Sequence, residues 1–222
     1  MKPSLLTLYA ASLCLLLGAC SKAADSAVGD MPSSGDADQP DFTAIVTVKQ
    51  EPGGSPFFQL DPETCLFPTN YQEPFTGERR LICGLSVWPK DNRCWIHWMD
   101  FLQEGAVQAA PAGEGDGADV LEDWMTSVED GYLTVHYETY WGDGSVPHTL
   151  LLVTGENPED PYQVRLVHLR NGDAAQSPAD ALIYFNLETL PSTGGGYLPL
   201  TLIWKTGAGQ TASKSFLFRS RQ

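Results

Sequence analysis

Residues 131–141, Gly-Tyr-Leu-Thr-Val-His-Tyr-Glu-Thr-Tyr-Trp, decide the fold class of this chain. Side chains alternate between two faces along this segment, and one face carries Leu133, Val135, Tyr137 and Thr139. Alternation among β-branched and aromatic residues predicts a strand with one face turned to a core. Nowhere does the 222-residue sequence show the apolar period of a helix of three turns. We therefore predict an all-β protein.

The remainder of the second half contains further segments that are predicted to be strands. Short strands are predicted between Gly- and Asn-containing turns, at Thr149–Val153, Tyr162–Leu169, Ala181–Leu187, Tyr197–Trp204 and Ser213–Arg219. Strands of this length at this spacing are typical of an antiparallel β-sandwich. We place that domain over residues 119–222.

A separate β domain is predicted over residues 42–104. It opens with the β-branched run Thr43–Lys49, and two longer strands, Arg79–Trp88 and Arg93–Leu102, flank the turn residues Pro89-Lys90-Asp91-Asn92. Residues 105–118 are rich in Gly, Ala and Pro and lack Leu, Ile and aromatic residues. This composition predicts an interdomain linker.

The first 20 residues have the form of a lipoprotein signal. Lys2 precedes an apolar stretch, Leu5–Leu17, which is shorter than the roughly 20 residues of a spanning helix. Leu17-Gly18-Ala19-Cys20 resembles a bacterial lipobox. We predict a signal peptide over 1–19 and lipidation of Cys20, which anchors the chain to a membrane. Ser21 rather than an acidic residue favours the outer membrane, and residues 20–41 are predicted to be a flexible acidic linker.

The charge balance excludes one class of partner. The chain has 13 Lys and Arg residues against 28 Asp and Glu residues, a formal net charge of −15. Such a charge repels phosphate backbones, so we predict no nucleic-acid binding. Between Cys94 and Tyr162 there is no Lys or Arg. This acidic half either serves solubility or attracts a cationic partner by electrostatic steering.

No catalytic or metal motif is present in the sequence. There is no Gly-x-Ser-x-Gly, His-Glu-x-x-His or phosphate-binding glycine loop, no two cysteines form a Cys-x-x-Cys pair, and no histidine pair has zinc-ligand spacing. We therefore predict a non-enzymatic protein with no cofactor and no metal.

Three cysteines lie in the predicted domains. Cys83 and Cys94 are on consecutive strands, and a turn centred on Lys90 and Asp91 places them diagonally rather than directly opposite. A disulfide requires Cβ atoms close to 4 Å apart. Two alternatives are open, a Cys83–Cys94 disulfide and small buried thiols, and the state of Cys65 is not fixed.

Tryptophans cluster on the same hairpin at Trp88, Trp95 and Trp98. Uninterrupted alternation puts Trp95 and Trp98 on opposite faces of their strand. Such aromatic side chains either pack against the second domain or form a stacking surface for a ligand.

The sequence resembles the NigD-like proteins, lipoproteins of the Bacteroidota, over nearly all of its mature length. The residues that carry the resemblance include Ala44–Lys49, Phe58–Asp61, Glu73–Glu78, Ile96–Asp100, Asp123–Thr134, Val153–Tyr162 and Leu200–Lys205. The resemblance implies an N-terminal OB-like barrel and a C-terminal β-sandwich. It also implies a link to bacteriocin immunity or export. Cysteines at 65, 83 and 94 depart from the Thr or aliphatic residues expected there.

Two functional hypotheses follow. The first is a membrane-anchored lipoprotein that binds a protein or peptide partner at the cell envelope, with bacteriocin immunity as its form by family analogy. The second is a glycan-binding accessory lipoprotein that uses Trp88, Trp95 and Trp98.

Overall fold

A computed structural model of the chain describes residues 39–71, 77–88, 90–129, 131–142 and 144–221. All regular structure in these ranges is β, in agreement with the predicted class. The described part contains no helix with the length and apolar character needed to span a bilayer. The predicted signal peptide and most of the acidic linker lie outside the described residues.

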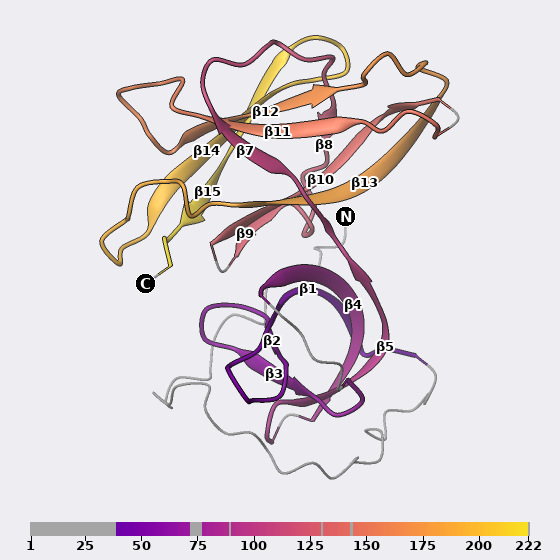
Figure 1. Cartoon of the computed structure of the whole chain (residues 1–222), viewed down its shortest axis with the longest axis vertical. Coiled ribbons are helices and arrows are strands. Elements are labelled where there is room, and N and C mark those ends of the chain that lie inside the picture. The colour runs from indigo at the N-terminus through magenta and orange to yellow at the C-terminus, as the bar shows by residue number, and fades with distance from the viewer. Residues whose placement is uncertain (1–38, 72–76, 89, 130, 143, 222) are drawn as a thin grey trace, which may run out of the picture.

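The N-terminal strands close into a five-stranded barrel (Figure 1). They are β1 (Phe42–Lys49), β2 (Phe57–Gln59), β3 (Cys65–Pro68), β4 (Arg79–Trp88) and β5 (Arg93–Phe101), joined in the order β1-β2-β3-β5-β4. Only the β3–β5 pairing within this barrel is parallel. Apolar side chains fill the interior, among them Val46, Phe58, Leu81 and Leu85.

A β-bulge interrupts the β4–β5 hairpin. Leu85 pairs with Ile96, whereas the neighbouring Gly84 pairs with Trp98, so His97 is an extra residue on β5. One inserted residue reverses which side chains face the core. Met99 therefore joins the barrel interior, and the expectation that Trp95 and Trp98 lie on opposite faces is wrong.

The second half forms a sandwich of two sheets, as predicted. One sheet has the order β6-β13-β10-β8, with β9 also on β10, and it comprises β6 (Gln103–Glu104), β8 (Asp119–Val120), β9 (Ser127–Glu129), β10 (Tyr132–Trp141) and β13 (Ser177–Asn186). The other has the order β15-β14-β12-β11-β7, and it comprises β7 (Ala106–Ala109), β11 (Thr149–Thr154), β12 (Gln163–Leu169), β14 (Leu198–Lys205) and β15 (Thr211–Phe218). The sequence predicted an antiparallel sandwich, and both sheets also contain parallel pairs, because β6, β7 and β14 each run parallel to a neighbour. Side chains from both sheets, such as Leu133, Phe185 and Leu202, build one core.

Residues 105–118 are not a linker. They contain β7, which pairs with β11, and the stretch after β7 lies against β12. Arg165 of β12 donates to the carbonyl of Gly113 at 3.0 Å, and a Cβ at Gly115 would lie 2.7 Å from the His168 carbonyl oxygen. The small residues that suggested a linker let the backbone lie close against the sheet.

The barrel and the sandwich are joined directly. Leu102 alone separates β5 from β6, and it packs with Ile45 of the barrel and Tyr132 and Tyr184 of the sandwich. In Figure 1 the barrel lies below the sandwich, against the sheet that contains β10 and β13. This contact creates the surfaces described next.

Candidate functional site

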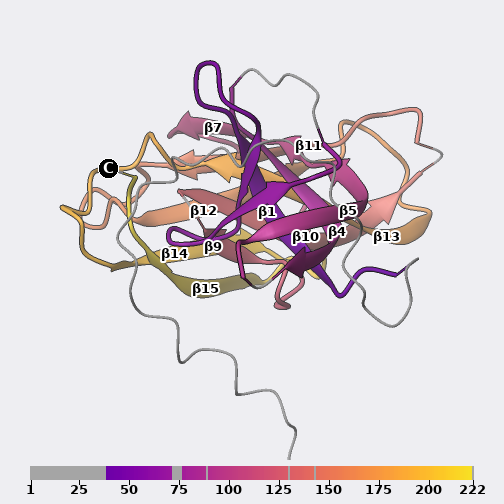
Figure 2. The ribbon, with the colours of Figure 1, turned by 90° about the horizontal axis from the view of Figure 1, so that it is seen from below.

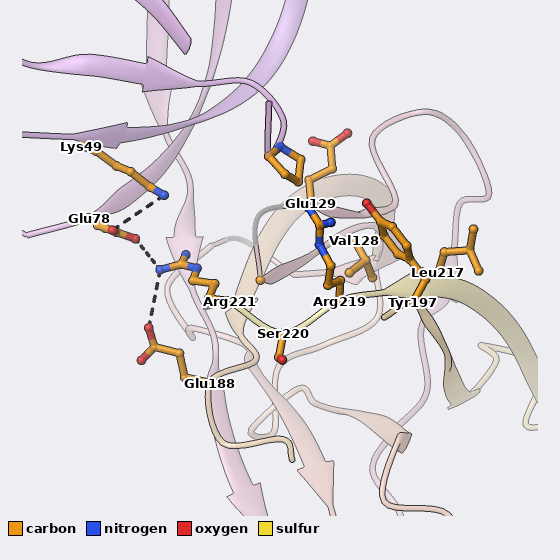
Figure 3. A pocket seen from close by; sticks show the side chains of 12 residues that line it. Lys49, Glu78, Val128, Glu129, Glu188, Tyr197, Leu217, Arg219, Ser220 and Arg221 are labelled. Carbon is orange, nitrogen blue, oxygen red and sulfur yellow. Dashed lines mark hydrogen bonds and ion pairs between the residues drawn. The ribbon is translucent and has the colours of Figure 1, made fainter. Parts of the chain in front are cut away.

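A cleft of about 670 Å³ lies where the barrel meets the sandwich (Figure 3). The barrel contributes Lys49, Pro62 and Glu78, and β9, β15 and the C-terminal residues of the sandwich contribute most of the remaining lining. Its volume is within the range of small-molecule pockets. The lining is polar and charged as well as apolar, so the cleft differs from a dry cavity.

Charged side chains bridge the two domains on one side of the cleft. Arg221 donates from Nη1 to Glu78 Oε2 at 2.5 Å and to Glu188 Oε1 at 3.5 Å, and Lys49 Nζ lies 3.9 Å from Glu78 Oε1 (Figure 3). The Arg221 guanidinium also lies 4.2 Å from the centre of the Tyr132 ring. Burial raises the pKa of the Tyr132 hydroxyl, although the Arg221 charge opposes that shift. These contacts join the C-terminal residues to the barrel.

Arg80 is the buried counterpart of this bridge. Its side chain is completely buried, and it donates to Thr47 Oγ1 of the barrel at 3.0 Å and to Thr134 Oγ1 of the sandwich at 3.1 Å. Its Nη2 lies 3.4 Å from Glu129 Oε2, which lines the cleft. Glu129 of the cleft is therefore paired with a buried cation that has partners in both domains.

The opposite side of the cleft is open and amphipathic. Leu217 is 71% exposed and Tyr197 is 56% exposed. The Arg219 guanidinium lies 4.9 Å from the centre of the Tyr197 ring, and within the described ranges no carboxylate pairs with it. Exposed Tyr and Leu side chains beside a half-buried Arg at a cleft are the composition expected of a binding surface. Nothing in the sequence pattern marks these three residues, because β14 and β15 bring them together.

Each histidine has protein partners. His136 is buried between two carboxylates, with Nδ1 2.6 Å from Asp123 Oδ2 and Nε2 2.7 Å from Asp180 Oδ2. Burial opposes the charge on His136, but the hydrogen bonds to Asp180 and Asp123 outweigh it and raise its pKa. Carboxylates only accept hydrogen bonds, so the protonated ring donates to both and links Asp123 to Asp180.

His97 and Ser86 form a Ser–His contact, with Oγ 3.0 Å from Nε2. Ser86 is completely buried, so its hydroxyl cannot reach an external substrate. This pair fixes the outer face of the barrel hairpin rather than forming a nucleophile and base. Within the described residues, no cluster of side chains has the composition of a metal site.

The candidate disulfide is not formed, because Cys83 and Cys94 are free, buried thiols. Strand register pairs Cys83 with Met99 and Cys94 with Val87, which keeps the two cysteines diagonal as the turn position implied. Burial raises the pKa of Cys83 to about 12, and burial together with the nearby Cys83 raises the pKa of Cys94 to about 12. Both residues are part of the barrel core.

The three tryptophans lie on one face of the barrel hairpin. Trp98 pairs with Gly84, Trp95 with Ser86, and Trp88 is two residues beyond Ser86 on β4, so all three point away from the barrel interior. Trp98 is 41% exposed and its indole covers Gly84, where a Cβ would lie 2.4 Å from its Nε1. The bulge at His97 thus puts Trp95 and Trp98 on the same face, whereas uninterrupted alternation would put them on opposite faces.

Comparison with known protein families finds a match to this architecture. The family model described as "NigD-like C-terminal beta sandwich domain" matches residues 103–218. That match begins at β6, which agrees with the structural boundary and not with a boundary after residue 118. No curated protein matches the chain significantly.

Three crystal structures show a similar fold. The first is named as a toxin-related protein from Parabacteroides distasonis (TM-score 0.67, 22% identity, 81% of this chain and 93% of that chain covered). The second is a NigD-like immunity protein from Bacteroides caccae (TM-score 0.58, 17% identity, 81% and 98% covered). The third is named as a lipoprotein from Bacteroides fragilis (TM-score 0.57, 11% identity, 82% and 99% covered). At these identities the similarity establishes the fold alone.

Proposed function

The chain belongs to the NigD-like family, and from this premise we propose that it is a non-enzymatic lipoprotein of the cell envelope that binds a protein or peptide partner in its interdomain cleft. The observation that carries the proposal is the cleft itself, in which the exposed Tyr197 and Leu217 and the half-buried Arg219 form a wall opposite the ion pairs of Arg221. A partner side chain can be desolvated there without any rearrangement of the two domains.

The chemistry of the described residues supports a binding role. Ser86, the hydroxyl that contacts a histidine, is buried, and both ring nitrogens of His136 are occupied by carboxylates. Neither arrangement leaves a nucleophile next to a general base at the cleft.

Attachment to the membrane is the second part of the proposal. Cys20 and its lipobox support lipidation, and one similar structure is named as a lipoprotein. Multiple acyl chains on Cys20 would hold the chain at a bilayer, and we propose the outer membrane as its location. The acidic residues 21–41 would separate the barrel from the lipid headgroups. One similar structure is named as an immunity protein, so recognition of a bacteriocin-related peptide is the specific form of the proposal.

Site-specific photocrosslinking in growing cells tests the proposal. Tyr197 is replaced by p-benzoylphenylalanine, and Tyr140, an exposed tyrosine of β10 outside the cleft lining, is replaced in the control. We expect a discrete adduct at Tyr197 that is absent at Tyr140 and that Arg219→Glu removes. Equal adducts at both positions, or none at Tyr197, would show that the cleft is not a binding site.

A second candidate function, glycan binding, is favoured by the shared outer face of Trp88, Trp95 and Trp98. Tryptophan rings stack on the apolar faces of sugars in the same way as they stack on other flat groups. Retention on immobilised surface polysaccharide is expected to fall in Trp95→Ala. Trp124→Ala, which removes an exposed tryptophan outside the hairpin, is the control. Equal retention of both variants would exclude this candidate.

A further inference from the structure

The long edge strand β15 borders the cleft. It has eight residues and pairs only with β14, and in Figure 2 it runs along the margin of the sandwich with no strand beyond it. The other strands at the sandwich edges are shorter, with four residues in β7, three in β9 and two each in β6 and β8. An unpaired edge presents a row of backbone donors and acceptors that can pair with another chain.

The register shows which backbone groups face outward. In an antiparallel pair, alternate residues direct their N–H and C=O groups toward the partner strand and away from it. Thr201 N donates to Tyr162 O at 3.0 Å, so Thr201 turns away from β15 and its register partner Ser215 turns away from β14. By the same alternation Ser213 and Leu217 also point their backbone groups to the open side.

The open side of β15 has little of the usual protection: one lysine, and the short strand β9 of the other sheet close by. Along β13, the stretch beyond its pairing with β6 carries Pro178 and Asp180, which discourage strand addition. Residues 211–218 contain no proline and no bulge. Their single charge, Lys214, is held by Glu122 at 3.5 Å and lies over the Phe216 ring.

Side chains at the end of β15 indicate what an added strand would carry. Leu217 is largely exposed, and the Arg219 cation beside Tyr197 has no carboxylate partner within the described ranges. An extended segment on this edge gains apolar contact at Leu217 and charge complementarity at Arg219 if it carries an apolar residue followed by an acidic one. A second copy of this chain fits less well, because each copy has a net charge of −15.

We propose that β15 receives an extended segment of the partner as an additional strand, with a carboxylate of that segment paired to Arg219. This inference rests on the proposed function, and it specifies the form of the partner: a β-strand with an apolar and an acidic side chain near one end. Strand addition draws its affinity from main-chain hydrogen bonds and its specificity from the alternate side chains.

A proline scan of the edge tests the inference. Random dodecapeptides displayed on phage are selected on the full chain, and the selected peptides are titrated against Ser215→Pro and Ser215→Ala. The Pro variant removes an outward N–H, and Ser215→Ala keeps it. We expect Ser215→Pro to weaken binding by about tenfold and Ser215→Ala to leave it unchanged. Hydrogen exchange on the unaltered protein, which needs no variant, is expected to show slowed exchange at Ser213, Ser215 and Leu217 when peptide is bound.

The possible outcomes separate this inference from the proposed function. Peptides that bind Ser215→Pro normally, leave the edge amides unprotected and still require Arg219 would overturn strand addition while supporting the cleft as the binding site. Failure to enrich any peptide over a serum albumin control would also overturn strand addition. Self-association that Ser215→Pro abolishes would assign the edge to a second copy and contradict the proposal.

Discussion

His148 and His168 share a buried hydrogen bond inside the sandwich, with His148 Nδ1 3.0 Å from His168 Nε2. His168 Nδ1 lies 2.7 Å from the Gly117 carbonyl oxygen, so this nitrogen donates. His148 Nε2 lies 3.0 Å from Asp173 Oδ2 and donates to that carboxylate. The two rings thus connect the Gly117 carbonyl to the Asp173 carboxylate, and the His148 ring stacks on Trp141.

The pKa values of His136 and His168 should shift in opposite directions. Burial lowers the pKa of His168 below the usual 6.5, whereas the Asp180 and Asp123 hydrogen bonds outweigh burial and raise the pKa of His136 above 6.5. The His136 contribution to stability is present below pH 6.5 and is lost as pH rises through the raised pKa of the folded protein. The His168 contribution is present above pH 6.5 and is lost as pH falls from 6.5 through the lowered pKa of the folded protein. NMR titration of the imidazole nitrogens measures both pKa values. Asp180→Asn should lower the pKa of His136 and leave that of His168 unchanged.

Replacing Arg80 should uncouple the two domains. Arg80→Met leaves the buried hydroxyls of Thr47 and Thr134 without their shared donor, and we expect a loss of about 3 kcal/mol in unfolding free energy. Urea denaturation followed by tryptophan fluorescence measures the loss. Arg219→Met is the control, because Arg219 is a half-buried arginine that does not connect the two domains. This variant should change the unfolding free energy by less than about 0.5 kcal/mol. Equal stability of the two variants would show that Arg80 does not join the domains.

Glycine substitutions test whether residues 105–118 belong to the folded sandwich. A Cβ at Gly105 would lie 2.2 Å from Cε1 of Phe185, whereas a Cβ at Gly113 meets no atom within 4 Å. We expect Gly105→Ala to destabilise the protein by about 1 to 3 kcal/mol through overpacking, with Gly113→Ala close to neutral. Thermal unfolding of both variants makes the comparison. A neutral Gly105→Ala would restore the linker interpretation.

Thiol labelling tests the state of the barrel cysteines. Burial raises the pKa of the Cys83 and Cys94 thiols to about 12, so neither should react with iodoacetamide in the native protein at pH 8. Both should react after denaturation without a reducing agent, because neither is in a disulfide. Peptide mass spectrometry reads each site separately. Labelling of Cys83 and Cys94 only after reduction would contradict the structure.

Lipidation is testable in the intact cell. Radiolabelled palmitate should be incorporated into the unaltered protein and not into Cys20→Ser, and the variant should leave the membrane fraction. Cys14→Ser, which alters the cysteine within the predicted signal peptide, is the control. Incorporation into Cys20→Ser would place the anchor elsewhere.

Local pattern was sufficient for much of the fold. The alternation in residues 131–141 predicted β10, and the Pro89–Asn92 turn predicted the β4–β5 hairpin and the diagonal placement of Cys83 and Cys94. The bulge at His97 was not predictable, since an extra residue in one strand is defined only by its pairing with another. It reversed the face of Trp98 and Met99. The prediction of a linker over residues 105–118 was wrong for a related reason. Small residues are common in linkers, and they are also needed where a backbone packs closely against a sheet.

The sequence by itself determined the β class, the two-domain division, the excess of acidic residues and the predicted anchor at Cys20, because these depend on composition and on spacing between near neighbours. Only the tertiary structure decided the cleft, in which Lys49 and Glu78 of the barrel meet Arg221 at the other end of the chain. It likewise decided that Arg80 bridges two threonines, that His136 lies between two carboxylates, and that β15 is left at an edge. Contacts of this kind join residues far apart in sequence, so their partners are set by strand order and register rather than by any local pattern.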